Sequence, residues 1–421
     1  MSRNGRFGIA SVLSSPTSAR VGRVFAIVVA AAALQVLGQT ALARGLPKDE
    51  VGVVSLLLGA LPLLSALSLL GQDSSSVRFL TRADASRYDA RRHFRDVLLI
   101  ILPLGALVAL LGARFYSLAG LAAVATVTLV VSQNAVSMTT SALRAEHRYE
   151  LAMTGTRLPV IVTAAALVLL AASRALTLHA ALWAVIVSYA STAAFLTAYA
   201  GRRLPAGGTR VPRSVIQNGL FFLGISVSLS VMIAMDKLII GKLMPMSELA
   251  VYATVFAVMK GFDFLFYSFT YVLMPRVNVV EKLSLKRLNL VIACVAVVVG
   301  GLYLLFGQDM VHLLFDGKYD AGAYLVAPFA LSGVLKLFYS VPSSVIGGRL
   351  PRTALRQFLW FNLAGIVVNV GLDVVLILRM GLLGAAIATA VAWALRLAGG
   401  YLVMLRHRGH LGPLKELEGE L

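Results

Sequence analysis

Four oxygen-bearing side chains in the second half of the chain could together bind a small cation. Asn369 and Asp373 are four residues apart, so a helix would place both on one face. Asp236 and Thr389 lie at comparable distances from the ends of two other apolar segments. Alkali cations prefer carboxylate, amide and hydroxyl oxygens, and two neighbouring carboxylates repel each other unless a cation or proton joins them. The set predicts a site for Na⁺ or H⁺; alternatively, Asp236 pairs with Lys237 and Asp373 belongs to a polar patch.

Three cationic side chains in the same half could bind an anion. Lys260, Lys336 and Arg396 each lie near the middle of an apolar segment, where a buried charge is costly and therefore indicates function. If the three side chains converge, Arg396 can donate to two oxygens of one phosphate while the lysines act as point charges. Such an arrangement suits a phosphate or pyrophosphate group. Two alternatives stay open: Lys260 pairs with Asp263 three residues on, and Arg396 extends to the membrane surface.

The composition excludes a water-soluble protein. Of 421 residues, 59% are hydrophobic and 14% are charged, whereas soluble domains are nearer half apolar and a quarter charged. The same balance excludes a disordered chain. The single cysteine, Cys294, cannot form an intramolecular disulfide, and the six histidines form no Cys/His cluster with metal spacing. We therefore predict an integral membrane protein without a cofactor.

Apolar runs along the chain predict about twelve transmembrane helices. A bilayer core of about 30 Å requires roughly 20 apolar residues per helix. The segments between these runs, of which Gln72–Asp96 and Gly307–Gly322 are the longest, are too short for a soluble catalytic domain. The predicted fold is an all-α membrane protein, and any chemistry must lie within the bundle. The predicted spans are 22–43, 51–71, 97–113, 117–140, 152–173, 177–200, 215–241, 249–275, 288–307, 324–348, 357–378 and 381–405.

The formal charge of +19 follows from membrane topology. Lys and Arg concentrate in alternate connecting segments, and the intervening segments are short and poor in both. This is the positive-inside pattern of an even number of spans with both termini in the cytoplasm. A nucleic acid partner is therefore not implied. The basic internal segments are 78–95, 144–157, 202–213, 276–287 and 349–356.

The chain repeats itself in two halves, which predicts two six-helix lobes. We expect a cytoplasmic tail at 1–21, an N-lobe at 22–200, a linker at 201–214, a C-lobe at 215–405 and a second tail at 406–421. A parallel repeat leaves a cleft at the membrane midplane, where transporters hold their substrates. The repeated residues are Arg44, Leu46, Pro47, Glu50 and Val53, which recur as Lys242, Met244, Pro245, Glu248 and Val251.

The deep polar groups are unequally divided between these lobes. The ionisable ones all belong to the C-lobe, whereas the N-lobe offers only neutral groups at depth, such as Gln35, Gln39 and Asn134.

Two segments resemble a known family. Residues 235–241, Met-Asp-Lys-Leu-Ile-Ile-Gly, with Glu248 and Tyr252 after them, resemble the seventh helix of the polysaccharide and lipid-linked oligosaccharide flippases. These belong to the multidrug/oligosaccharidyl-lipid/polysaccharide (MOP) superfamily. Residues 381–389, Gly-Leu-Leu-Gly-Ala-Ala-Ile-Ala-Thr, resemble the start of the family's twelfth helix. The resemblance implies alternating access and movement of an undecaprenyl-pyrophosphate-linked glycan from the cytoplasmic to the outer leaflet.

The resemblance also implies a role for the four oxygen-bearing residues. Related peptidoglycan-precursor flippases hold sodium with an Asp on helix seven, an Asn and an Asp on helix eleven, and a Thr on helix twelve. Asp236, Asn369, Asp373 and Thr389 match these positions. Those flippases also line the first lobe with Arg and have two further helices, features we do not find in this sequence. The departures favour an O-antigen, capsule or exopolysaccharide unit as the substrate.

We therefore predict a flippase for a polyprenyl-pyrophosphate-linked glycan, driven by Na⁺ or H⁺ and located in the bacterial cytoplasmic membrane. It is expected to be a monomer that contacts membrane lipid and serves polysaccharide polymerase machinery. One alternative is a multidrug exporter of the same superfamily, which would favour a cleft with unpaired carboxylates. A membrane glycosyltransferase or polymerase would need a larger loop than this chain offers, so we predict that the protein is not an enzyme.

Overall fold

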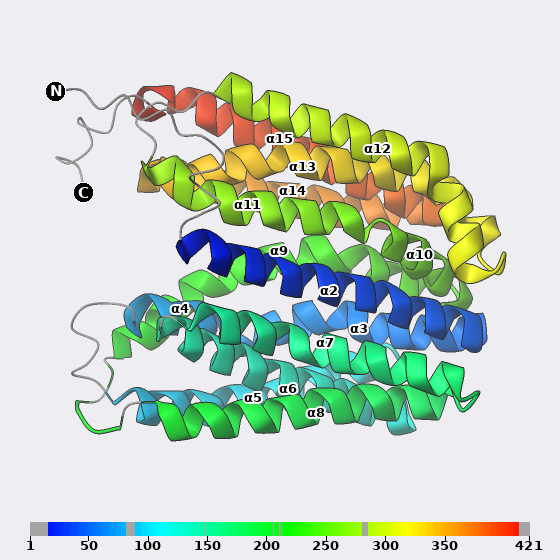
Figure 1. The fold of residues 1–421 in the computed structure, drawn as a ribbon, viewed down its shortest axis with the longest axis horizontal. Coiled ribbons are helices and arrows are strands. Elements are labelled where there is room, and N and C mark those ends of the chain that lie inside the picture. Colours follow the sequence, from blue (N-terminus) through cyan, green and yellow to red (C-terminus); the bar gives the residue numbers. More distant parts are fainter. Residues whose placement is uncertain are drawn as a thin grey trace.

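The computed structural model describes residues 16–80, 89–146, 148–204, 206–209, 211, 213–279 and 285–411. Within these ranges the regular structure is helical, with no strand. The long helices run along a common direction (Figure 1). Ten of the described helices are long and apolar enough to cross a membrane, and a bent helix pair supplies an eleventh. The first predicted span, 22–43, lies within a further helix, α2 (Pro16–Gly45). The predicted all-α membrane fold is confirmed.

The helices form two groups that lie side by side (Figure 1). We call the first group the N-lobe and the second the C-lobe. The N-lobe contains α2, α3 (Lys48–Leu69), α4 (Gln72–Leu80), α5 (Ala90–Phe115), α6 (Gly120–Ala145), α7 (Tyr149–Ala172) and α8 (Leu178–Arg203). The C-lobe contains α9 (Arg213–Leu243), α10 (Met246–Val258), α11 (Lys260–Val279), α12 (Leu285–Phe315), η2 (Asp320–Leu325), α13 (Val326–Arg349), α14 (Arg352–Met380), α15 (Leu382–Arg406) and η3 (Arg408–Leu411).

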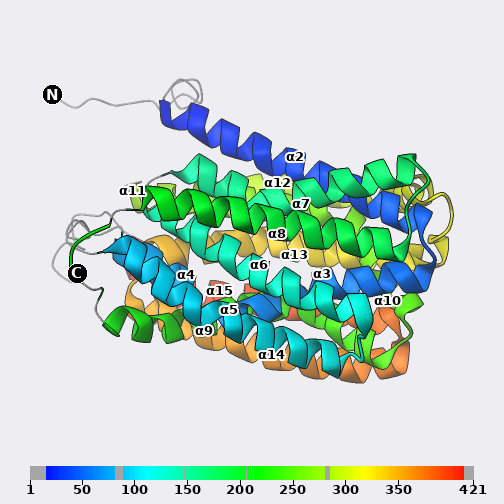
Figure 2. The same cartoon turned by 90° about the horizontal axis from the view of Figure 1, so that it is seen from below.

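The two ends of the bundle are distinguished by the helix termini. We call the end where α2 begins and α15 ends the basal end, and the end where α2 and α12 finish the distal end (Figures 1 and 2). Since successive long helices alternate in direction, most described residues of the predicted basic segments fall at the basal end. Residues 81–88, 147, 205, 210, 212 and 280–284 of these segments lie outside the described ranges.

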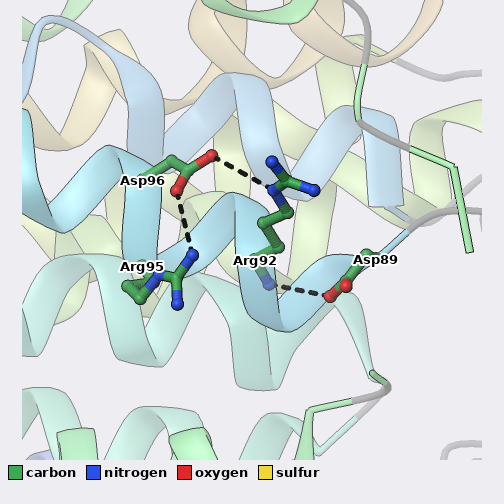
Figure 3. Close-up of polar contacts among 4 residues, drawn as sticks. All are labelled: Asp89, Arg92, Arg95 and Asp96. Carbon is green, nitrogen blue, oxygen red and sulfur yellow. Dashed lines mark hydrogen bonds and ion pairs between the residues drawn. The ribbon is translucent and has the colours of Figure 1, made fainter. Parts of the chain in front are cut away.

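The segment 72–96, predicted as a connection, is partly helical. It contains α4 and the first turns of α5, while residues 81–88 lie outside the described ranges. The carboxylate of Asp89 caps α5 by accepting a 2.8 Å hydrogen bond from the Arg92 backbone N–H, which lowers the pKa of Asp89. Asp96 lies 4.0 Å from Arg92 and 3.8 Å from Arg95 (Figure 3). Such exposed pairs contribute little stability, so the cap is what defines where α5 begins.

The predicted eighth span is broken into two helices. α10 and α11 meet at Met259 with a bend of 49°. The Tyr303 hydroxyl of α12 donates a 2.8 Å hydrogen bond to the Val258 carbonyl at this break. A Cβ atom on Gly261 would lie 2.5 Å from the Tyr303 oxygen, so glycine leaves room for the phenol. An inserted polar side chain is a common cause of a kink, and here it satisfies a carbonyl that water cannot reach in a membrane.

Cationic side chains join the two lobes at the distal end by capping helix C-termini of the opposite lobe. Arg44 of α2 donates to the carbonyls of Leu313 and Leu314 at 2.5 and 2.8 Å. Lys242 of α9 donates to the Phe115 carbonyl of α5 at 2.7 Å. C-terminal carbonyls carry partial negative charge, so each contact is favourable.

Lys318, between α12 and η2, extends the same pattern. Its ammonium group donates to the carbonyl of Ala43 at 2.8 Å and to that of Leu46. Burial, with the charge of Lys48 nearby, lowers the pKa of Lys318. The distal contacts therefore comprise Arg44, Lys242 and Lys318.

Close helix packing reinforces the distal contacts. A Cβ atom on Gly52 of α3 would collide with the Met246 backbone of α10, and one on Gly241 of α9 would lie 2.9 Å from Leu56. At the basal end α4 packs on α9, where the Ser75 hydroxyl donates to the Val215 carbonyl at 2.5 Å. The lobes are thus in contact at both ends, and one hydrophobic core contains residues of both lobes.

Candidate functional site

The structure brings together the four residues predicted to bind a cation. Asp236 on α9, Asp373 on α14 and Thr389 on α15 each lie about two turns from the distal ends of their helices. All four are buried, with Asn369 2% exposed and Asp373 fully buried. Asn369 Nδ2 donates to Asp373 Oδ2 at 3.1 Å, and the Asp236 and Asp373 charges act on each other. We call these four residues the acidic site.

Tyr252 is a member of this site that the sequence reasoning did not assign. Its hydroxyl donates to Asp236 Oδ2 at 2.5 Å and lies against the Thr389 side chain. The second Asp236 oxygen accepts from the Lys237 backbone N–H at 2.9 Å. The Lys237 ammonium lies 4.5 Å from the Phe256 ring centroid, and no Asp236–Lys237 ion pair is found among the described residues. The alternative of an Asp236–Lys237 ion pair is therefore not what the structure contains.

The donor set of the acidic site fits a small cation. Asp373 Oδ1 and Asn369 Oδ1 are buried and accept no hydrogen bond from any described residue. Buried acceptors normally have a partner, and a cation or proton would supply one. No group of three or more His, Cys, Asp or Glu side chains suited to a metal ion occurs in the described ranges. Two carboxylates with neutral oxygens suit a monovalent cation, and sodium fits this set.

The predicted cation cluster is only partly assembled. Lys336 on α13 forms an ion pair with Asp263 on α11, with Nζ 2.5 Å from Oδ1. The predicted alternative, a Lys260–Asp263 pair, is thus replaced by a pair between two helices. The Lys336 ammonium also lies 5.1 Å from the Trp393 ring centroid.

Arg396 lies against the same indole ring as Lys336. It is 4% exposed, and its guanidinium lies 5.4 Å from the Trp393 centroid and 5.6 Å from that of Tyr339. Its Nε has no hydrogen-bond partner among the described residues. Arg396 is therefore buried between two aromatic rings, so the alternative that it extends to the membrane surface is wrong. We call Lys336, Arg396 and Trp393 the cationic site.

Lys260 lies apart from the cationic site, at the start of α11. Its charge interacts with Asp263, with Lys237, and with Arg157 of the N-lobe. Arg157 Nε is buried without a partner among the described residues. The sequence puts Arg157 at the edge of an internal basic segment and predicts a neutral N-lobe at depth. This prediction is wrong, because Arg157 lies well inside α7.

The neutral N-lobe residue Asn134 has a structural role. Its amide oxygen accepts from the Ser65 hydroxyl at 2.8 Å, and its amide nitrogen donates to Ser68 at 2.8 Å and to the Ile101 carbonyl at 3.3 Å. Because these bonds join α3, α5 and α6, Asn134 stabilises the lobe and is not available to a substrate.

One pocket in the C-lobe is lined by members of both sites. Asp236 and Thr389 line it, and so do Lys336, Asp263 and Trp393, whereas Asn369, Asp373 and Arg396 are not among its lining residues. The rest of its wall is largely apolar and aromatic. A charge bound in this pocket would therefore act on groups of both sites.

Two solved structures share the fold of this chain. An inward-facing multidrug resistance MATE family transporter of the MOP superfamily aligns with a TM-score of 0.66 and 15% identity, over 92% of this chain and 96% of its own. The lipid II flippase MurJ in an inward closed conformation aligns with a TM-score of 0.62 and 10% identity, over 91% and 87%. No family model matches the chain, and no curated protein does. The chain therefore has the same fold as these two proteins.

Proposed function

We propose that the protein is a flippase that moves a polyprenyl-pyrophosphate-linked oligosaccharide across the membrane by cation-coupled alternating access. The observation that carries the proposal is the cationic site. Arg396 is buried with an unpartnered Nε, and Lys336 lies against the same indole ring. A buried guanidinium with a free donor suits a phosphate oxygen.

The charges outside the cationic site also favour an anionic substrate. Lys260 of the C-lobe and Arg157 of the N-lobe interact across the lobes. Both basic side chains lie within the bundle, where a positive charge is costly unless an anion approaches. A pyrophosphate between the lobes would relieve this repulsion, while the polyprenyl chain stays in the surrounding lipid.

Cation binding at the acidic site would supply the driving force. Two carboxylates on different helices repel each other when the site is empty, and a Na⁺ or H⁺ between them draws α9 and α14 together. A ligand shifts a conformational equilibrium only if it binds one state better. Because Asp236 and Thr389 of the acidic site line one pocket with Lys336 of the cationic site, cation binding would change how Lys336 receives the pyrophosphate.

The distribution of basic residues supports a basal end in the cytoplasm, and we propose a location in the bacterial inner membrane. The distal contacts would then close the outer side, and entry from the cytoplasmic leaflet would require α4 and α9 to separate at the basal end. An O-antigen, capsule or exopolysaccharide unit on a polyprenyl pyrophosphate would supply the required anion. We propose a monomer that passes its product to polymerase machinery.

Multidrug export is the second candidate, because a MATE transporter in complex with R6G shares the fold with a TM-score of 0.59 at 15% identity, over 94% of this chain and 97% of its own. An organic cation would require carboxylates that are free to face it. Asp263 is instead paired with Lys336, and Asp236 is held by Tyr252. These contacts favour the anionic substrate.

Reconstitution into liposomes tests the proposal. Protein variants would be compared for movement of a fluorescent polyprenyl-diphosphate oligosaccharide, a neutral glycolipid and a lipophilic cationic dye. Arg396→Gln should slow the diphosphate lipid at least tenfold, whereas Arg379→Gln, an exposed arginine at the distal end of α14, should not. Equal losses on the diphosphate and neutral lipids, or transport of the dye alone, would contradict a pyrophosphate-binding role.

A further inference from the structure

The basal end of α8 carries a hollow in which arginines gather around one tyrosine. α8 packs on α6 and α7 and lies along the edge of the N-lobe farthest from the C-lobe (Figure 1). The hollow is therefore separate from the acidic and cationic sites. Its lining residues recur at helical spacing, so one face of the last turns of α8 carries all of them. They are Phe195, Ala198, Tyr199, Arg202 and Arg203.

The hollow carries more positive charge than its neighbours balance. The Arg203 guanidinium lies 5.9 Å from the Tyr199 ring centroid. Arg148, at the start of α7, donates a 2.7 Å hydrogen bond to the Tyr199 hydroxyl and lies 3.6 Å from Glu146. Among the described residues, no carboxylate forms an ion pair with Arg202 or Arg203. An anion would therefore be attracted to this end of α8.

The C-terminus of α8 is capped by another residue, so it does not occupy these arginines. Arg91 of α5 donates to the Leu204 carbonyl at 3.0 and 3.2 Å and to the Arg202 carbonyl at 3.3 Å. C-terminal carbonyls carry partial negative charge and attract basic side chains of the last turn. Because Arg91 satisfies them, the exposed side chains of Arg202 and Arg203 can face a ligand.

The hollow lies where the apolar core of a bilayer meets the lipid headgroups. α8 has 26 residues, so at about 1.5 Å per residue it is about 39 Å long and exceeds the apolar core of about 30 Å. Arg202 and Arg203 are the last two residues of this span. Phe195 lies about 10–12 Å deeper along the helix and is 62% exposed. A ligand here meets guanidinium groups at one end and an aromatic ring in the apolar layer at the other.

We propose that this hollow binds an anionic glycerophospholipid of the leaflet at the basal end, with its phosphodiester on Arg202 and Arg203 and an acyl chain against Phe195. A guanidinium can donate two parallel hydrogen bonds to phosphate oxygens. Basic groups at the membrane surface also attract acidic lipids. A free phosphate would use the arginines alone, whereas a lipid uses the exposed ring as well. The inference does not depend on the proposed function, because α8 lies away from the cationic site.

Native mass spectrometry of the purified full-length protein tests the inference. Delipidated protein in detergent micelles would be titrated with phosphatidylglycerol and with phosphatidylcholine of the same acyl chains. Wild type should bind the first phosphatidylglycerol at least about tenfold more tightly than the first phosphatidylcholine. The double variant Arg202→Gln/Arg203→Gln should lose this preference. Arg406→Gln, which removes an exposed arginine from the last turn of α15 at the same end, should behave like wild type.

A second measurement distinguishes a lipid from a free anion. Glycerophosphoglycerol, the same headgroup without acyl chains, should not displace the bound phosphatidylglycerol even in large excess. Phe195→Gln should weaken phosphatidylglycerol binding severalfold while leaving Arg202 and Arg203 in place, because the acyl chain loses an apolar contact. Since both substitutions in the hollow change exposed side chains, the variants are expected to fold.

Four results would overturn the inference. Equal affinity of wild type for the two lipids would remove the anionic site. Equal losses in Arg406→Gln and in the double variant would show a general attraction to surface arginines. Displacement by glycerophosphoglycerol would show that the hollow binds an anion without its acyl chains. Loss of phosphatidylglycerol in Arg396→Gln, with the double variant unchanged, would place the lipid in the cationic site. The liposome assay would decide the transported substrate in every case.

Discussion

Under the proposed function Asp263 would compete with an incoming anion for Lys336, so Asp263→Asn should strengthen pyrophosphate binding. The two atoms of the pair are 2.5 Å apart, with the Lys336 side chain 9% exposed and that of Asp263 31% exposed. Breaking a fully buried pair costs about 3–5 kcal/mol and an exposed one up to about 1 kcal/mol. This pair is intermediate, so we expect Asp263→Asn to destabilise the ligand-free protein by about 1–3 kcal/mol.

In Asp263→Asn an incoming anion no longer has to displace a carboxylate from Lys336 when it binds. Since about 1.4 kcal/mol corresponds to a factor of ten, the dissociation constant for a polyprenyl diphosphate should fall about tenfold. Lys336→Met should raise it by a similar factor, because the anion loses a cation.

Binding would be measured in lipid nanodiscs with polyprenyl diphosphate and with the corresponding neutral alcohol. Asp309→Asn, which removes an exposed carboxylate from the distal part of α12, provides the matched control. If Asp263→Asn lowers thermal stability but leaves diphosphate affinity unchanged or weaker, Lys336 does not hold the anion and the reasoning is wrong.

Three further expectations follow from the fold. Tyr303→Phe leaves a buried carbonyl at the helix break unpaired and should lower the free energy of unfolding by about 1–3 kcal/mol. The sodium concentration that gives half of the Na⁺-induced thermal stabilisation should stay the same, and a change in it would link the break to the cation site. Gly52→Leu should push α3 away from Met246 of α10, so the distance between spin labels placed on the two lobes at the distal end should increase. Unchanged distances would contradict the close packing of α3 on α10. Because burial lowers the pKa of Lys318 when the lobes are joined, raising the pH towards 10 should favour the joined state, and Lys318→Met should abolish that pH dependence in the same distance measurement.

Spacing on helices was enough to predict the acidic site. Asn369 and Asp373 share a face because they are one helical turn apart, and Asp236 and Thr389 fall at the same depth on neighbouring helices. Tyr252 could not be assigned in the same way, because a tyrosine in an apolar run equally suits simple packing. Only the 2.5 Å contact with Asp236 places Tyr252 in the acidic site.

The cationic site was harder to predict because charge pairing depends on which helices are neighbours. The i, i+3 spacing suggested a Lys260–Asp263 pair, but the break at Met259 precedes Lys260 and Asp263 pairs with α13 instead. Gly261 was the one local signal of that break. Arg157 was missed because its flanking residues resemble a connecting segment, although α7 begins two turns earlier.

The central claim is that the protein exposes a pyrophosphate-linked glycan on the far side of the membrane. Its most direct test is the sidedness of lipid-linked oligosaccharide in cells depleted of the protein, probed with a glycan-modifying enzyme added from outside. We predict that the pool grows and stays protected from the enzyme, and that its mass identifies the glycan. A pool of normal size that remains accessible would contradict the flippase and favour drug export.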